Sequence, residues 1–109
     1  MKTSEAGGES AGEARVPWPS MTSRLQLAPR ARLRLDRQTG RFMLLYPERG
    51  LVLNDTGAAI LHLCTGERTV EAMIDELAER YGHPRPDVER EILGFLRTMA
   101  ERGLIQEAP

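Results

Sequence analysis

Two residues that could form a nucleophile and its base lie close together in the sequence, at His62 and Cys64. A reactive cysteine needs a base that accepts its proton, because the thiolate is the nucleophile. The surrounding segment is predicted to be helical, and side chains two residues apart on a helix point to different faces. Cys64 falls on the apolar stripe of that helix, where a free cysteine behaves as a small apolar residue. The spacing therefore favours a structural cysteine.

The other ionisable side chains form no catalytic or metal-binding pattern. His83 precedes Pro84 in a predicted loop, and two isolated histidines without a cysteine or carboxylate pattern do not make a metal site. The acidic residues of 71–79 fall opposite the apolar stripe of their predicted helix, on its solvated face. The phosphate-binding patterns GxxxxGK and GxGxxG do not occur. We therefore expect no enzymatic activity, no metal and no cofactor.

Composition limits where the protein works. The single cysteine excludes an internal disulfide and a thiolate metal cluster. No apolar run approaches the roughly 20 residues that cross a bilayer. The first twenty residues lack the apolar stretch of a secretory signal peptide. These features predict a soluble, cytoplasmic protein.

Three short segments have the patterns of strands. Residues 32–36 (RLRLD) alternate between leucine and charged residues, as a half-buried strand does. Residues 41–46 (RFMLLY) are apolar at both parities, which predicts a central strand covered on both faces. Pro47 and Gly50 suit a hairpin turn before a third strand at 51–53. We expect a meander of three antiparallel strands.

Three helices are predicted after the sheet, because the apolar period changes from two to 3.6. Their predicted first and last residues are Asn54 or Asp55 to Gly66, Thr69 to Gly82, and Pro86 to Gly103. Their predicted inward stripes are Ala59, Ile60, Leu63 and Cys64; Val70, Met73, Ile74, Leu77 and Tyr81; and Val88, Ile92, Phe95, Leu96 and Met99. Gly94 lies in mid-helix, where its missing side chain would permit close approach of another backbone.

The predicted architecture is an α+β domain in which a three-stranded antiparallel sheet is followed by three helices, in an order that resembles a winged helix. Residues 1–24 are rich in small and polar residues and are predicted to be a disordered extension. The folded domain is predicted to span 25–106, and 107–109 form a tail. Within the domain, residues 21–50 have seven arginines against Asp36 and Glu48.

The winged-helix order raises the alternative of a nucleic-acid-binding regulator. Residues 54–109, which include all three predicted helices, have eleven acidic residues against six arginines. A helix that reads DNA should instead present basic or amide side chains to the groove. DNA binding is therefore the less favoured alternative.

The two edge strands of the predicted sheet differ in how well they are protected from pairing with another chain. Arg32 and Arg34 guard the first strand, and Pro29 precedes it, whereas the third strand (LVL) has no charge and no proline. Unpaired N–H and C=O groups at such an edge recruit another chain. A peptide could add there as a fourth strand, with side-chain pockets to select it. The alternatives are that the protein's own tail covers the edge or that two copies pair through it, so the expected state is a monomer or such a homodimer.

The folded region resembles a known family in its order of motifs. The segments PERGLVLN, LHLCTGERTV and ERGLI occur in the order and spacing of PqqD, the pyrroloquinoline quinone biosynthesis protein D. The resemblance covers about Pro29 to Ile105. It implies a non-catalytic recognition element that binds the precursor peptide PqqA and presents it to the radical S-adenosylmethionine enzyme PqqE. Related recognition domains serve sister pathways of modified peptides, which is the alternative partner.

In related domains the peptide lies as an added strand beside the third strand and against the third helix. The resemblance therefore implies a site at the same unguarded edge. We expect the backbone of the third strand to bind the peptide, with the third helix lining the groove. The predicted peptide-binding residues are Arg49, Leu51, Val52, Leu53, Asn54, Leu96 and Met99.

Overall fold

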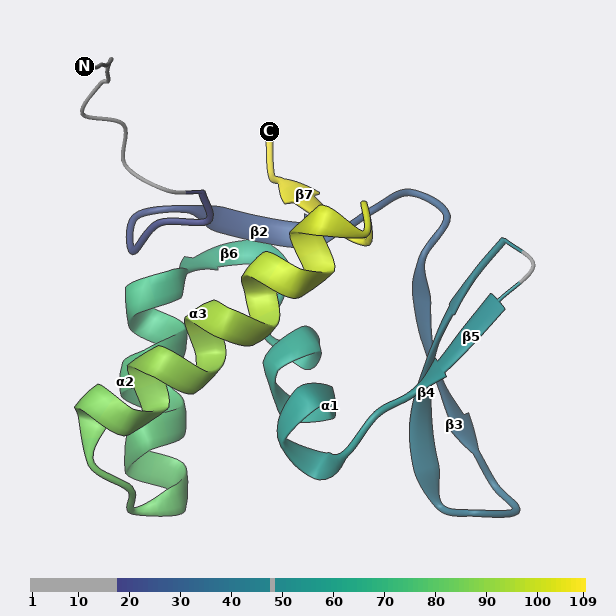
Figure 1. The fold of residues 1–109 in the computed structure, drawn as a ribbon, viewed down its shortest axis with the longest axis horizontal. Helices are drawn as coiled ribbons and strands as arrows, with labels where there is room; N and C mark the ends of the chain where they lie inside the picture. Colours follow the sequence, from purple (N-terminus) through teal and green to yellow (C-terminus); the bar gives the residue numbers. More distant parts are fainter. Residues whose placement is uncertain (1–17, 48) are drawn as a thin grey trace, which may run out of the picture.

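The computed structural model describes residues 18–47 and 49–109, which form two small antiparallel sheets and three helices (Figure 1). The elements are β2 (Arg24–Leu27), β3 (Arg32–Asp36), β4 (Arg41–Tyr46), β5 (Arg49–Val52), α1 (Asp55–His62), β6 (Thr65–Thr69), α2 (Val70–Tyr81), α3 (Arg85–Glu101) and β7 (Ile105–Glu107). The prediction of antiparallel strands with three helices is confirmed. The resemblance to a winged helix stays a prediction.

A second sheet, with the order β6-β2-β7, corrects the prediction of a single sheet before the helices. Its central strand β2 pairs with β6, which lies between α1 and α2, and with β7, which follows α3. Strand β6 has the polar sequence TGERT and β7 has three residues, so neither shows the alternation that predicts a strand. Figure 1 shows this sheet where α2 begins and α3 ends.

The β3-β4-β5 sheet is a meander with one face against the helices. Residues paired across strands share a face, so Leu33, Leu44 and Leu51 lie together. Leu44 is completely buried there. On the same face Phe42 makes an edge-to-face contact with His62 of α1, with ring centroids 4.7 Å apart. This face anchors the sheet to the helical part of the molecule.

The opposite face of this sheet is not covered by the described residues. It contains the pairs of Met43 with Arg34 and with Val52. Met43 is half-buried and Val52 is 53% exposed. In Figure 1 the sheet lies at one end of the molecule, with the helices on one side only. The prediction that residues 41–46 are covered on both faces is therefore wrong for the described part of the chain.

Residues 18–24 have defined contacts, although the sequence places them in a disordered extension. The Trp18 indole N–H donates to the Glu107 carboxylate at 2.7 Å. Glu107 is the last residue of β7 rather than part of a tail. The structured region thus extends beyond 25–106 at both ends. The remainder of the predicted extension, residues 1–17, lies outside the described residues.

Two helices begin with the side-chain caps that the sequence predicts. The Asn54 side chain accepts a hydrogen bond from the Gly57 N–H at 2.7 Å, and the Thr69 hydroxyl accepts one from the Ala72 N–H at 3.1 Å. Each bond satisfies a backbone donor that has no partner within the first turn.

We expect Asn54→Ala to lower the free energy of unfolding by about 1 kcal/mol, because the Gly57 N–H loses its acceptor. Asn54→Asp should retain most of the stability, since aspartate is an equally good cap. Urea denaturation monitored by circular dichroism measures both variants. Equal stability of Asn54→Ala and the wild type would show that the cap has no energetic role.

The second and third helices end at the predicted glycines. Gly82 has a φ of +66°, and Gly103 has a φ of +71°. After α3 the Leu104 N–H donates to the Met99 carbonyl at 3.0 Å, which together with the Gly103 N–H forms a Schellman motif. The first helix ends at His62, whereas Gly66 (φ +87°) lies within β6. The prediction that α1 continues to Gly66 is wrong because residues 65–69 pair with β2.

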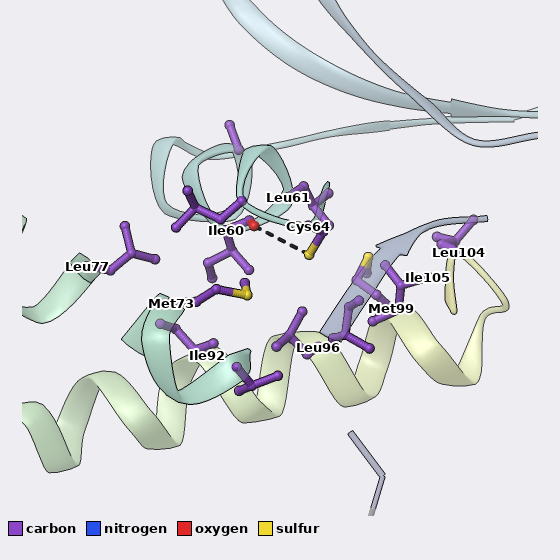
Figure 2. Close-up of a cluster of buried hydrophobic side chains, with 14 of the residues drawn as sticks. Ile60, Leu61, Cys64, Met73, Leu77, Ile92, Leu96, Met99, Leu104 and Ile105 are labelled. Carbon is purple, nitrogen blue, oxygen red and sulfur yellow. Dashed lines mark hydrogen bonds between the residues drawn. The ribbon is translucent and has the colours of Figure 1, made fainter. Parts of the chain in front are cut away.

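The core lies where the three helices meet β2 and β7 (Figure 2). It contains Leu25, Ile60, Leu61, Cys64, Met73, Ile74, Leu77, Ile92, Leu96, Met99, Leu104 and Ile105. The predicted stripes are buried with three exceptions: Tyr81 is 43% exposed, and Ala59 and Phe95 are half-buried. The core therefore follows the helical period at the centres of the stripes and departs from it at their margins.

Cys64 is a core residue, as its position on the stripe predicts. Its thiol donates to the Ile60 carbonyl at 3.5 Å, as the dashed line in Figure 2 shows. Burial disfavours the thiolate and raises the pKa of Cys64 to about 12. His62 is exposed and its Nδ1 lies 2.7 Å from the Ala58 carbonyl, so it is bound to its own helix.

We expect the Cys64 thiol to resist a thiol reagent such as DTNB in the native protein at pH 8, and to react at once in urea. The pKa of Cys64 is higher in the folded than in the unfolded protein. Burial of the neutral thiol therefore contributes fully to the stability of the fold below about pH 9, and this contribution is lost as the pH rises toward 12. Rapid labelling of the native protein at pH 8 would contradict the burial of this thiol.

Candidate functional site

Strand β5 has one edge without a partner strand among the described residues. The Leu53 N–H donates to the Phe42 carbonyl at 2.9 Å, which marks these residues as a hydrogen-bonded pair. Pairs of this kind alternate with non-bonded pairs in an antiparallel ladder. The pair of Leu44 and Leu51 is therefore also bonded. The residues of β5 that alternate with Leu51 and Leu53 direct their N–H and C=O groups outward.

The outward groups belong to Gly50 and Val52. Of the three residues whose backbones were predicted to bind a peptide, only Val52 faces the open edge, whereas Leu51 and Leu53 point their backbone groups toward β4. Arg49 and Tyr46 also form a hydrogen-bonded pair by this alternation, so the backbone groups of Arg49 point toward β4 and not toward the open edge. Gly50 is the backbone site that the sequence prediction missed, because the phase of the ladder is fixed only by the contacts with β4.

A groove of about 210 Å³ runs along this edge between β5 and the helices. Its walls are the end of β5, the first turns of α1 and one side of α3. The lining residues are Leu51, Val52, Leu53, Asn54, Thr56, Gly57, Ile60, Glu91 and Phe95. The outward backbone groups of Val52 thus lie beside an apolar groove, which is the combination that strand addition requires.

Phe95 and Glu91 form the α3 wall of the groove. They are one helical turn apart, so their side chains share a face of α3. The Phe95 ring packs against α1 at Gly57, where a Cβ would lie 3.3 Å from the ring atom Cε1. The absence of a side chain at Gly57 therefore allows the ring to lie against the backbone of α1. Among the described residues that line the groove, Glu91 is the one ionisable side chain.

Leu96 and Met99, which were predicted to line the groove, lie in the core instead. Leu96 is 0% exposed and Met99 is 3% exposed. Figure 2 shows both side chains pointing from α3 into the buried cluster. Gly94 also differs from expectation, because a Cβ at this exposed position would meet nothing within 4 Å. No described backbone approaches Gly94.

Among residues 18–47 and 49–109, no group of three histidine, cysteine or acidic side chains is placed to hold a metal ion. None of the helices in the described ranges is long and apolar enough to cross a membrane. The described groups that line the groove are main-chain donors and acceptors, apolar side chains, the Asn54 and Thr56 side chains and the Glu91 carboxylate.

Comparison with known families identifies this arrangement. The family model described as coenzyme PQQ synthesis protein D (PqqD) matches residues 41–105, a range that includes β4, β5 and all three helices. The chain belongs to the PqqD family.

Proteins called PqqA binding protein are similar to it along most of their length. That of Rhodopseudomonas palustris strain TIE-1 is 40% identical over 89 residues, which cover 82% of this chain and 87% of the relative. That of Methylococcus capsulatus strain Bath is 32% identical over 83 residues, covering 76% and 87%.

A solved structure of a PqqD protein has the same fold. It is the PqqD truncation of Methylobacterium extorquens PqqCD, a functional, stand-alone recognition element for ribosomally synthesised and post-translationally modified peptides. The likeness has a TM-score of 0.67 at 30% identity and covers 76% of this chain and 88% of that one. The PqqD resemblance in the sequence is therefore confirmed by sequence and by fold.

Proposed function

We propose that this PqqD-family protein is a non-catalytic carrier of the precursor peptide PqqA in the biosynthesis of pyrroloquinoline quinone. PqqA adds as a strand to the open edge of β5 and lies in the groove before α3. The observation that supports this most directly is that the backbones of Gly50 and Val52 face outward and that Val52 lines an apolar groove. The names of the relatives supply the identity of the peptide.

Main-chain pairing and apolar burial have separate roles in this proposal. Gly50 and Val52 each offer one N–H and one C=O, and each hydrogen bond contributes only about 0.5–1.5 kcal/mol net. Useful affinity therefore requires that the peptide also bury apolar side chains in the groove, against Leu53, Ile60 and Phe95. The ladder fixes the register of the peptide, and the groove selects its side chains.

We propose further that the bound peptide is handed to the radical S-adenosylmethionine enzyme PqqE. A strand held at an edge leaves one face of its own side chains and its outer backbone accessible, so the carrier does not enclose its cargo. The protein itself supplies no reacting group in this scheme. It orders a flexible peptide and holds it in an extended form that an enzyme can recognise.

The test is Val52→Pro, which removes one outward N–H. Proline is tolerated on an edge strand where its nitrogen faces solvent. We expect PqqA to bind more weakly by about 1 kcal/mol, roughly fivefold in Kd. Isothermal titration calorimetry measures the change, and circular dichroism verifies the fold.

The matched control is Leu35→Pro on the opposite edge of the same sheet. By the same alternation, Leu33 and Leu35 of β3 direct their N–H groups away from β4. The control should leave PqqA affinity unchanged. Equal affinity of Val52→Pro and the wild type, with the fold intact, would contradict binding at β5.

The same edge could instead pair two copies of the chain, and we propose the monomer as the binding form. A dimer through β5 would occupy the groups that the peptide needs. Light scattering should therefore give the monomer mass with and without PqqA. A doubled mass that falls when the peptide is added would show that self-pairing competes with the peptide.

A further inference from the structure

One face of the β3-β4-β5 sheet has an apolar centre that no described residue covers. This outer face is defined by Arg32, Arg34, Met43, Leu45 and Val52. The side chains of Met43 and Leu45 lie over Gly50, where a Cβ would come within 3.0 Å of Met43 Cε and 3.2 Å of Leu45 Cδ2. Gly50 therefore lets these side chains extend the apolar centre toward β5, where Val52 is 53% exposed.

Arginines line the β3 side of this apolar centre. Two hollows of about 820 and 530 Å³ on β3 and β4 share Arg34 and Leu45 and also contain Arg30, Arg32 and Arg37. Among the described residues that line them, Asp36 is the one carboxylate. All ion pairs within the described ranges lie in residues 68–90. The arginines of the outer face therefore form no ion pair with a described carboxylate.

The chemistry of this face favours a protein partner with an acidic surface. Protein interfaces have an apolar centre and a polar rim, and arginine is enriched in them. Complementary charge across an interface speeds association and selects the partner. A nucleic acid would use the arginines but would leave the central Met43 and Leu45 without a role.

Val52 connects the outer face to the peptide edge. A strand added beside β5 would point alternate side chains to the two faces of the extended sheet. One set would enter the groove before α3, and the other set would lie next to Val52 on the outer face. A protein on this face would therefore contact the carrier and the peptide together.

We infer that the outer face docks an acidic surface of the enzyme that acts on the bound peptide. This inference rests on the proposed function, because it places the partner of the same carrier. The enzyme recognises the loaded carrier by the apolar centre, the arginines and the exposed side chains of the added strand. The groove and the outer face are then separate surfaces, so variants can divide peptide binding from enzyme binding.

The experiment compares two double variants that change the net charge equally. Arg32→Glu with Arg34→Glu reverses charge on the outer face, and Arg80→Glu with Arg90→Glu reverses it on the helical part. PqqE is the probe, and biolayer interferometry measures its binding to the full chain with and without PqqA at low and high salt. Calorimetry measures PqqA binding to each variant. We expect the outer-face variant to bind PqqE at least about tenfold more weakly and with less salt dependence, and to bind PqqA as the wild type does.

Several results would overturn the inference. The first is PqqE binding that is unchanged in the outer-face variant, or that is weakened equally in the helical variant. The second is loss of PqqA binding in the outer-face variant. The third is tight binding of duplex DNA by the wild type that the outer-face variant abolishes. A wild-type mass of two chains that falls to one in the outer-face variant would assign the face to self-association instead. Failure of the wild type to bind PqqA would contradict the proposed function, whereas the PqqE measurement without peptide still tests the outer face.

Discussion

Replacing Phe95 with alanine is expected to weaken PqqA binding by about 1–2 kcal/mol, roughly 5–30-fold in Kd. The ring is half-buried in the free protein and forms the α3 wall of the groove, so a bound peptide would bury much of what remains exposed. Calorimetry with PqqA measures the loss. Phe95→Leu keeps an apolar wall and should retain most of the affinity.

The matched control for Phe95 is Leu93→Ala on the same helix. Leu93 is also a half-buried apolar residue of α3, but it does not line the groove. This control should lower the stability of the fold without changing the affinity of the folded protein for PqqA. Similar losses of affinity in Phe95→Ala and Leu93→Ala would mean that the groove has no specific role.

Replacing the next residue, Leu96, is expected to have the largest effect on stability. Leu96→Ala should lower the free energy of unfolding by about 2–5 kcal/mol, because Leu96 is 0% exposed and its removal leaves a cavity between α3 and the other helices. Its side chain does not reach the groove, so the folded protein should bind PqqA as the wild type does. Urea denaturation and calorimetry measure the two quantities separately.

A loss this large could unfold a small domain, since total stability is typically about 5–15 kcal/mol. Leu96→Met conserves volume and should cost less than about 1.5 kcal/mol, so it keeps the fold while it changes the side chain. If Leu96 lined the groove, Leu96→Met would alter PqqA affinity with little effect on stability. Because Leu96 lies in the core, we expect Leu96→Met to leave the affinity for PqqA unchanged.

Local patterns predicted the meander, the three helices, two N-terminal caps and two C-terminal glycines. Asn54, Thr69, Gly82 and Gly103 each act through neighbouring backbone, so their roles can be inferred from the sequence alone. The second sheet could not be inferred in this way. Its strands pair residues as distant as Leu25 and Glu107, and the polar segment 65–69 is a strand only because β2 lies beside it.

The candidate site was predicted in part for similar reasons. The LVL sequence, which has no charge and no proline, favoured the β5 edge of the sheet over the β3 edge. Only the ladder with β4 determines that Val52 and Gly50, rather than Leu51 and Leu53, face outward. On α3 the apolar period groups Phe95 with Leu96 and Met99. Packing against the core separates them, because Leu96 lies at the centre of the stripe and Phe95 at its margin.

Amide hydrogen exchange, followed residue by residue by NMR with and without PqqA, tests most directly that β5 is the edge that accepts the peptide. We expect the amides of Gly50 and Val52 to exchange more slowly in the complex, because each donates to the added strand. The outward amides of Leu33 and Leu35 on β3 should exchange at the same rate in both states. Bound peptide that protects the β3 amides, or that leaves Gly50 and Val52 unprotected, would contradict the account.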